Sequence, residues 1–217
     1  MAAECGPIRY MDLLVTRYPT LAPIRDDMMQ AYSLLEQCYA AGGKLLIAGN
    51  GGSAADADHI VGELMKGFKK SRKIAPELAK KLEETGGAYG RQIAEKLQGA
   101  LTAIALQNHA ALNTAYLNDV DGLCCYAQQV YGYGRPGDVF LGISTSGNSK
   151  NILYAAVVAR ALGMKVIGLT GRDGGKLKAL SDAAVVVPGE ETFMIQELHL
   201  PVYHCLCLML EDRFFEE

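Results

Sequence analysis

The sequence of 217 residues lacks an excess of charge of either sign. It has 21 Lys and Arg residues against 24 Asp and Glu residues, for a formal net charge of −3. This balance gives no reason to expect nucleic acid or an anionic membrane as a partner. Also missing is the run of about 18 to 20 uninterrupted apolar residues that a transmembrane helix needs. Charges at Glu4, Arg9, Asp12 and Arg17 interrupt the N-terminal stretch, so we expect neither a secretory leader nor a membrane span.

No cysteine pair has the C-x-x-C spacing of a redox or metal motif. Two pairs are too close in the sequence to be useful cross-links. We therefore expect free thiols, buried as small apolar residues in a reducing compartment, and the cytoplasm is the expected location. The six cysteines are Cys5, Cys38, Cys124, Cys125, Cys205 and Cys207.

The apolar residues, half of the chain, follow two alternating periods. Short apolar runs predict strands at 44–49, 138–144, 165–171 and 183–188. Helical spacing predicts helices at 24–41, 53–68, 149–163, 174–181 and 192–215. Strands that alternate with helices form parallel βαβ units, and a chain of this length suits a single domain. The sequence therefore predicts an α/β fold, a doubly wound parallel sheet sandwich.

Residues 66–99 differ in character, because they are mostly charged and form helical stretches broken at Pro76 and at Gly86-Gly87. Five of the eight residues 66–73 are basic. One interpretation is a solvated pair of short helices on the surface. The other is a lid whose basic residues help to hold an anion.

The stretch "IAGNGGSAAD" places Asn50, Gly51, Gly52 and Ser53 between a predicted strand and a predicted helix. Glycines permit a tight turn there, and the free N–H groups of a helix start favour a negative ligand. An N-cap role would explain Ser53 equally well. Neither the dinucleotide fingerprint nor a P-loop is present.

A second turn, "GISTSGNSKN", also joins a predicted strand to a predicted helix and carries four hydroxyl groups. One hydroxyl is enough to cap a helix, whereas a phosphate ester needs several donors. Both turns follow parallel strands, at whose carboxyl ends open α/β sheets bind ligands. The two turns together suggest a phosphorylated small molecule; the alternative is an ordinary Ser/Thr loop. The hydroxyl residues are Ser144, Thr145, Ser146 and Ser149.

Asp56, His59 and Glu63 have the spacing of one helix face. A carboxylate and an imidazole placed together can move protons near neutral pH. Alone, however, His59 and Glu63 could equally be a surface pair.

The last predicted helix carries Gln196, His199 and His204 among mostly apolar residues. Polar side chains on such a helix need hydrogen-bond partners. A functional site would provide these partners, but so would the protein core. Helix geometry places Gln196 and His204 about 80° apart around the axis, on one broad face, and points His199 elsewhere. Pro201 lies between them and is expected to kink the helix. We therefore expect His199 to be structural.

Four motifs in order, "GNGGSAADADH…E", "GISTSGNS", "GLTGRDGG" and "IQELHLPVYH", resemble the SIS (sugar isomerase) domain. Within it they are similar to the phosphoheptose isomerases, from about residue 24 to residue 215. The resemblance implies a flavodoxin-like three-layer α/β/α fold with long N- and C-terminal helices. It also implies a homotetramer with active sites at subunit contacts.

The resemblance further implies roles for individual residues. Glu63 and His204 correspond to the proposed acid-base pair, and a zinc ion is bound by His59, Glu63, Gln196 and His204. The implied substrate-binding residues are Asn50, Gly51, Gly52, Ser53, Glu63, Asn118, Asp119, Ser144, Thr145, Ser146, Ser149 and Gln196.

The implied reaction converts sedoheptulose 7-phosphate to D-glycero-D-manno-heptose 7-phosphate through an enediol. Alternatives are the isomerisation of another phosphosugar, or a non-catalytic SIS module that senses a sugar phosphate or binds a protein. A binding module has no use for the complete set of four residues, which favours catalysis. The chain departs from the family pattern in the 66–99 insert, at Phe193-Met194 and at Pro201, and these departures bear on which sugar fits.

Overall fold

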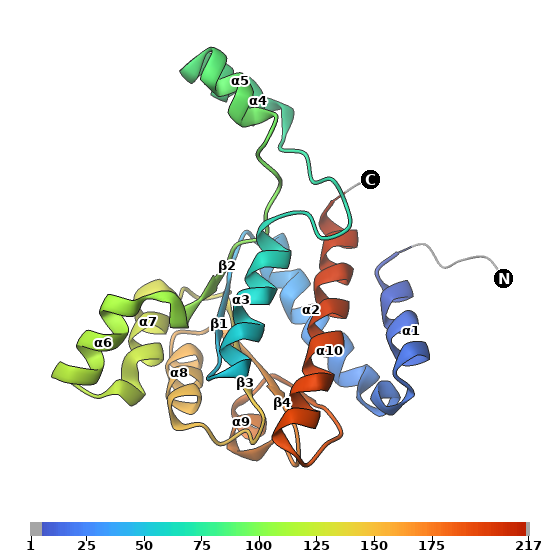
Figure 1. Cartoon of the computed structure of the whole chain (residues 1–217), viewed down its shortest axis with the longest axis vertical. Helices are drawn as coiled ribbons and strands as arrows, with labels where there is room; N and C mark the ends of the chain where they lie inside the picture. The colour runs from blue at the N-terminus through green and yellow to red at the C-terminus, as the bar shows by residue number, and fades with distance from the viewer. Residues whose placement is uncertain (1–5, 216–217) are drawn as a thin grey trace.

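A five-stranded parallel sheet runs through the middle of the computed structural model, which describes residues 6–215 (Figure 1). The strand order is β2-β1-β3-β4-β5. Register is set by apolar pairs, with Leu46 opposite Ile104 on one side and Phe140 on the other. The strands are β1 Leu45–Ala48, β2 Ala103–Ala105, β3 Val139–Ser144, β4 Lys165–Thr170 and β5 Ala183–Val186.

Helices cover both faces of the sheet, because alternate strand residues point into two separate apolar clusters. One face packs against α2 Arg25–Ala40, α3 Gly52–Met65 and α10 Thr192–Phe214, with α1 Ile8–Arg17 outside α10. The other face packs against α7 Cys125–Tyr133, α8 Lys150–Ala161 and α9 Gly175–Leu180. The remaining elements are α6 Ala110–Asp119, which packs on α7, and the 3₁₀ turns Pro19–Ile24, Leu106–Asn108 and Gly122–Cys124.

The predicted doubly wound α/β sandwich is confirmed, and each of the nine predicted elements is present within a few residues of its expected bounds. Strand β2 and helices α1, α6 and α7 were not predicted. Helix α10 continues through the buried Pro201, so this proline does not end the helix, and the kink expected there stays a prediction. The chain leaves β1 toward one edge of the sheet and β3 toward the other, which makes the β1–β3 junction the topological switch point.

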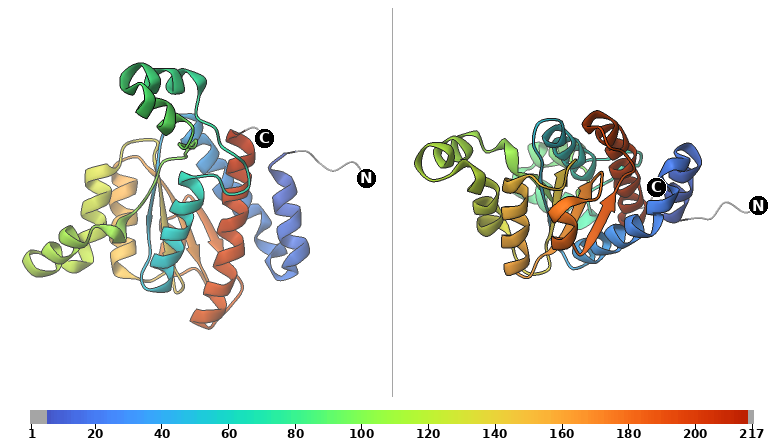
Figure 2. Two further views of the ribbon diagram at one scale, coloured as in Figure 1. Left: turned by 45° about the horizontal axis from the view of Figure 1, so that its top comes forward. Right: turned by 90° about the horizontal axis from the view of Figure 1, so that it is seen from below.

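The charged insert forms a helical hairpin that stands away from the body of the molecule (Figures 1 and 2). It consists of α4 Pro76–Gly86 and α5 Ala88–Ala94, which pack on each other. The predicted breaks are confirmed: Pro76 begins α4, and Gly87 separates the helices with φ +54°. Two chain segments form its neck, where Lys73 pairs with Gln98 in an antiparallel bridge.

The neck is fastened to the body by Arg72, which is 1% exposed. Its Nε donates to Glu211 Oε1 at 2.9 Å, and its two terminal nitrogens donate to the carbonyl groups of Leu64 and Glu63 at 2.7 and 2.8 Å. Glu211 also accepts hydrogen bonds from the backbone N–H groups of Phe68 and Lys69. The C-terminal ends of α3 and α10 and the neck are therefore joined at one buried ion pair.

Helix α10 is the one described helix that is long and apolar enough to cross a membrane, by length and composition alone. It packs against α1, α2, α3 and β4, and 56% of its apolar window is buried inside the protein. These contacts identify it as a core helix.

The expectation of free cysteines is confirmed for the five in the described part of the chain. Four of them are buried, whereas Cys124 is half-buried; Cys5 lies outside the described residues. Cys38 on α2 and Cys205 and Cys207 on α10 belong to the core cluster. These thiols therefore act as small apolar residues.

Candidate active site

The two predicted ligand-binding turns meet at the topological switch point. The glycine turn follows β1 and leads into α3, and the hydroxyl turn follows β3 and leads into α8. Their side-chain link is a reciprocal amide pair: Asn50 Nδ2 donates to Asn151 Oδ1 at 3.0 Å, and Asn151 Nδ2 donates to Asn50 Oδ1 at 2.8 Å. Asn151 was missed in the sequence, although it lies two residues after the last hydroxyl of the turn.

The glycine turn opens α3 as expected. Gly51, the N-cap residue, has φ +55°, a conformation that favours glycine. Ser53 lies inside the first helical turn and is buried, so the alternative N-cap role for Ser53 is wrong. The N-terminus of α3 therefore faces the switch-point crevice with a glycine backbone.

The hydroxyl turn is internally bonded. Ser144 Oγ donates to Ser149 Oγ at 3.1 Å, and Ser146 Oγ accepts from the backbone N–H of Asn148 at 3.2 Å. A side chain on Gly147 (φ +63°) would overlap the carbonyl group of Gly174. The turn is thus held in one shape at the N-terminus of α8.

A pocket of about 510 Å³ lies beside the hydroxyl turn. The residues that line it include Ser146 and Arg172, together with the acidic residues Asp173 and Glu190. Arg172 lies within the motif "GLTGRDGG", but the sequence alone indicated no role for this residue.

Helices α3 and α10 bring three of the predicted catalytic and metal residues together. The two helices pack side by side and run in the same direction (Figure 1). His59 Nε2 lies 3.2 Å from Glu63 Oε1 and 3.4 Å from His204 Nε2. The side chain of His59 is 42% exposed and that of Glu63 is 13% exposed. A carboxylate and two imidazoles thus line one partly open site, and a groove of about 210 Å³ between α1 and α10 also reaches His204.

The environment of His204 favours the neutral imidazole. Burial lowers its pKa, the neighbouring His59 lowers it further, and the carboxylate of Glu63 opposes this shift. A neutral imidazole can both give and accept a proton. His204 is therefore suited to proton transfer at neutral pH.

The donor set of this cluster fits a zinc ion. Two imidazoles and a carboxylate are common zinc ligands, and donor atoms around a tetrahedral zinc lie about 3.3 Å apart for bonds of about 2.0 Å. The separations of 3.2 and 3.4 Å match this spacing, and Glu63 Oε2 is buried without a hydrogen-bond partner. Within residues 6–215, however, no group of three or more His, Cys, Asp or Glu side chains is arranged to hold a metal ion. The chemistry fits, but the side chains do not converge on one point.

Gln196, the fourth zinc ligand implied by the resemblance, is not brought to the cluster. It lies eight residues before His204, which corresponds to about 12 Å along the helix. A Cβ atom on Gly52 would be 2.6 Å from Gln196 Nε2. Gln196 therefore covers the glycine turn, two helical turns away from the histidines.

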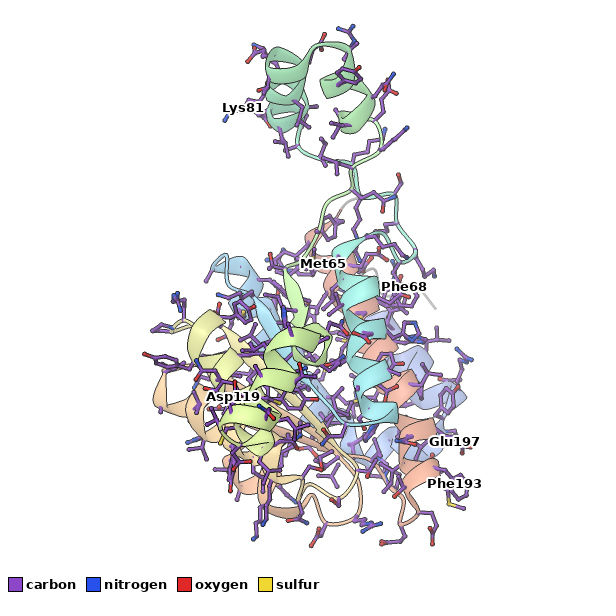
Figure 3. All side chains as sticks on the ribbon, turned by 60° about the vertical axis from the view of Figure 1, so that its left-hand side comes forward. Met65, Phe68, Lys81, Asp119, Phe193 and Glu197 are labelled. Carbon is purple, nitrogen blue, oxygen red and sulfur yellow. The ribbon has the colours of Figure 1, made fainter. Side chains whose placement is uncertain are left out.

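Asn118 and Asp119 are also apart from the two turns. They lie at the exposed C-terminal end of α6, where Asn118 Nδ2 donates to Asp119 Oδ1 at 2.7 Å. Figure 3 shows Asp119 on the opposite side of the view from Phe193 and Glu197, which mark the start of α10. Their substrate-binding role stays a prediction, and within one chain they point to no shared site.

His199 is confirmed as a residue of the interior. It is 0% exposed, and its Nε2 lies 3.2 Å from the carbonyl oxygen of Thr170, which accepts a hydrogen bond in the Nε2–H tautomer. Its Nδ1 is buried without a hydrogen-bond partner. Burial lowers the pKa of His199 from 6.5 to about 4.

This pKa predicts a pH-dependent loss of stability. Between pH 6.5 and about 4 the unfolded chain binds a proton at His199 and the folded protein does not, so stability falls as the pH falls through this window. The expected contribution is about 3 kcal/mol over the whole window. Urea unfolding from pH 7.5 to 5 measures the upper part of this loss, about 2 kcal/mol. His199→Gln is the control and should show a shallower slope; equal slopes in both proteins would contradict the assignment.

Comparisons of this chain with a family model, with known sequences and with solved structures all indicate the same family. The SIS domain family model matches residues 19–104 and 83–171. The phosphoheptose isomerase of Helicobacter pylori (strain P12) is 40% identical over 195 residues, 90% of this chain and 88% of that protein. The solved phosphoheptose isomerase from Francisella tularensis is 32% identical with a TM-score of 0.74, covering 93% of this chain and 94% of that chain. The one from Neisseria gonorrhoeae is 37% identical with a TM-score of 0.66, covering 84% of each chain. The chain therefore belongs to the SIS domain family and, within it, to the phosphoheptose isomerases.

Proposed function

We propose that the protein is an aldose–ketose isomerase that converts sedoheptulose 7-phosphate to D-glycero-D-manno-heptose 7-phosphate. The observation that carries this proposal is the arrangement at α3: its N-terminus opens on the switch-point turns, and its later turns carry Glu63 and His59 against His204. One end of this arrangement suits an anion and the other suits proton transfer. The relatives described above are named as phosphoheptose isomerases, which supports the proposal.

The phosphate group is assigned to the hydroxyl turn, because hydroxyl groups and the N-terminus of α8 favour an anion. The sugar hydroxyls are assigned to the glycine turn and to the amide that covers it. In this proposal the phosphate residues are Ser144, Thr145, Ser146 and Ser149, and the sugar residues are Asn50, Gly51, Gly52, Ser53 and Gln196.

Isomerisation moves a proton between C1 and C2 of the sugar. Glu63 takes the proton from C1 as a carboxylate, and the electron pair of that bond forms the enediol. His204 gives a proton to the oxygen on C2 and recovers one from the oxygen on C1, which its neutral form permits. Glu63 then returns its proton to C2. The net charge of the pair is unchanged at the end of the cycle.

Zinc belongs to the same proposal, as a metal that His59, Glu63 and His204 would hold once their side chains converge on it. A bound zinc ion supplies Lewis-acid polarisation of the sugar carbonyl. Gln196 was expected as a further ligand, but its place over Gly52 supports contact with the substrate.

A homotetramer with active sites at subunit contacts is proposed as the working state, in the cytoplasm. Large apolar side chains are exposed on the layer formed by α6, α7 and α8, as expected of a face that another subunit covers. Asn118 and Asp119 are assigned to the substrate of an adjacent subunit, because they lie at the end of this layer. The exposed apolar residues there are Leu117, Val120, Tyr131, Tyr133, Tyr154 and Val157.

Turnover of sedoheptulose 7-phosphate by the purified protein tests the proposal. We expect conversion to the aldose, loss of activity after chelation, and recovery with added zinc. Other phosphorylated ketoses, offered in parallel, serve as specificity controls. If the zinc-loaded protein leaves sedoheptulose 7-phosphate unchanged, the heptose assignment is wrong, and conversion of another sugar phosphate would identify the substrate.

A further inference from the structure

We infer that Tyr203 and Asp56 are positioning residues that fix the ring of His59 and hold a proton on its Nδ1. The inference deepens the proposed function, since it concerns a residue of the same site. The hydroxyl group of Tyr203 lies 3.3 Å from Asp56 Oδ1 and 3.0 Å from His59 Nδ1. Tyr203 also contacts the His59 ring edge to face, with centroids 5.5 Å apart and an interplanar angle of 72°.

The direction of these hydrogen bonds follows from what each group can donate. The carboxylate of Asp56 can only accept, so the single proton of the Tyr203 hydroxyl is donated to it. The phenol oxygen is then left to accept, and His59 must donate from Nδ1–H. Nδ1 of His59 is thereby engaged with Tyr203, and Nε2 is the atom that faces Glu63 and His204.

Because Tyr203 is buried, the hydroxyl group is the part of this side chain that its apolar surroundings do not require. Tyr203 is 2% exposed and belongs to the core cluster with Val202 and Leu206, where a phenylalanine ring would pack equally well. The other oxygen of Asp56, Oδ2, is buried without a hydrogen-bond partner. The hydroxyl of Tyr203 thus satisfies a buried carboxylate on one side and a site imidazole on the other.

The consequence is that the His59 ring is already oriented toward the site before a metal or substrate binds. A hydrogen bond on the remote ring nitrogen selects which nitrogen is free to bind a metal or to accept a proton. Loss of such a bond from a metal-ligating histidine lowers metal affinity by about 10- to 100-fold. Here the bond acts through a tyrosine between the carboxylate and the imidazole.

Nitrogen NMR of the imidazoles in the full-length, metal-free protein tests the inference at neutral pH. We expect His59 Nδ1 to carry a proton in the wild type, and Tyr203→Phe to lower the protonated fraction at Nδ1, because the acceptor for this proton is removed. Tyr39→Phe is the matched control, because it removes a buried tyrosine hydroxyl that contacts only the backbone carbonyl of Thr102 in the described structure. It should leave the His59 signals unchanged.

Zinc affinity, measured by competition with a chelator, gives a second readout. Tyr203→Phe should weaken zinc binding about 10- to 100-fold and Tyr39→Phe should not. An unprotonated Nδ1 in the wild-type protein would overturn the inference, even if Tyr203→Phe fails to fold. An Nδ1 that stays fully protonated in Tyr203→Phe would overturn it as well. Neither NMR result depends on turnover, so failure of the heptose assignment remains distinguishable.

Discussion

Glu63→Gln is expected to lower kcat/KM for isomerisation at least about 100-fold, the scale on which acid-base catalysis contributes. Glutamine keeps the size of the side chain and can still hydrogen bond to His59, whose Nε2 lies 3.2 Å from the carboxylate. It cannot take a proton from carbon. The packing of α3 therefore persists while proton transfer between C1 and C2 is lost.

The measurement is steady-state turnover of sedoheptulose 7-phosphate, together with exchange of the C1 proton in deuterated water. Both should fall in Glu63→Gln, with thermal stability close to that of the wild type. Glu197→Gln is the matched control, because Glu197 is an exposed carboxylate on α10 with no assigned role. Retention of exchange by Glu63→Gln at the wild-type rate would show that another group is the base.

Arg72→Met should destabilise the folded protein by about 3 to 5 kcal/mol, the usual cost of breaking a buried ion pair on one side. The side chains of Arg72 and Glu211 are 0% and 1% exposed, so methionine would leave a buried carboxylate without its cation. The substitution also frees the carbonyl groups of Glu63 and Leu64 at the end of α3. The substitution is therefore also expected to destabilise the C-terminal end of α3, the helix that carries Glu63.

Urea unfolding at neutral pH measures this loss. The control is Arg91→Met, because Arg91 pairs with Glu83 at 2.6 Å in the hairpin while their side chains are 58% and 50% exposed. Exposed pairs contribute about 0 to 1 kcal/mol. The double substitution Arg72→Met with Glu211→Leu should recover part of the loss, because no charge stays buried. A cost for Arg72→Met no larger than that for Arg91→Met would contradict the role of the buried pair.

The strands, the turns and the fold class could be predicted because their signals are local. An apolar run followed by Asn-Gly-Gly-Ser or Ser-Thr-Ser-Gly identifies a strand, a turn and a helix start within about ten residues. Strand β2 was missed because it has only three residues, Ala103–Ala105, and its place at the sheet edge is set by pairing with β1. The weakly patterned α6 gave no helical periodicity to read.

The candidate site could be predicted only in part, because several of its features depend on distance in space. The angle between Gln196 and His204 around α10 suggested a shared face, but their separation along the axis puts Gln196 over Gly52. Arg72 belongs to a basic run for which the sequence suggested a solvated surface or an anion-binding lid, whereas its burial depends on Glu211, 139 residues later. Tyr203 resembles a core residue in an apolar run, and only the neighbouring helix reveals its hydroxyl partners.

The neck of the hairpin also determines how freely this part of the chain can vary in length. Lys73 pairs with Gln98, and Gly99 N–H donates to Arg72 O at 2.7 Å, so the chain leaves and re-enters the body at adjacent points. The residues between Lys73 and Gln98 therefore form one closed loop, and the number of residues in this loop does not alter the path of the chain between β1 and β2. Closing a longer turn costs only about 0.6 kcal/mol for each doubling of its length. The protein can therefore lengthen or shorten the hairpin in evolution while β1, β2 and the site between α3 and α10 keep their register.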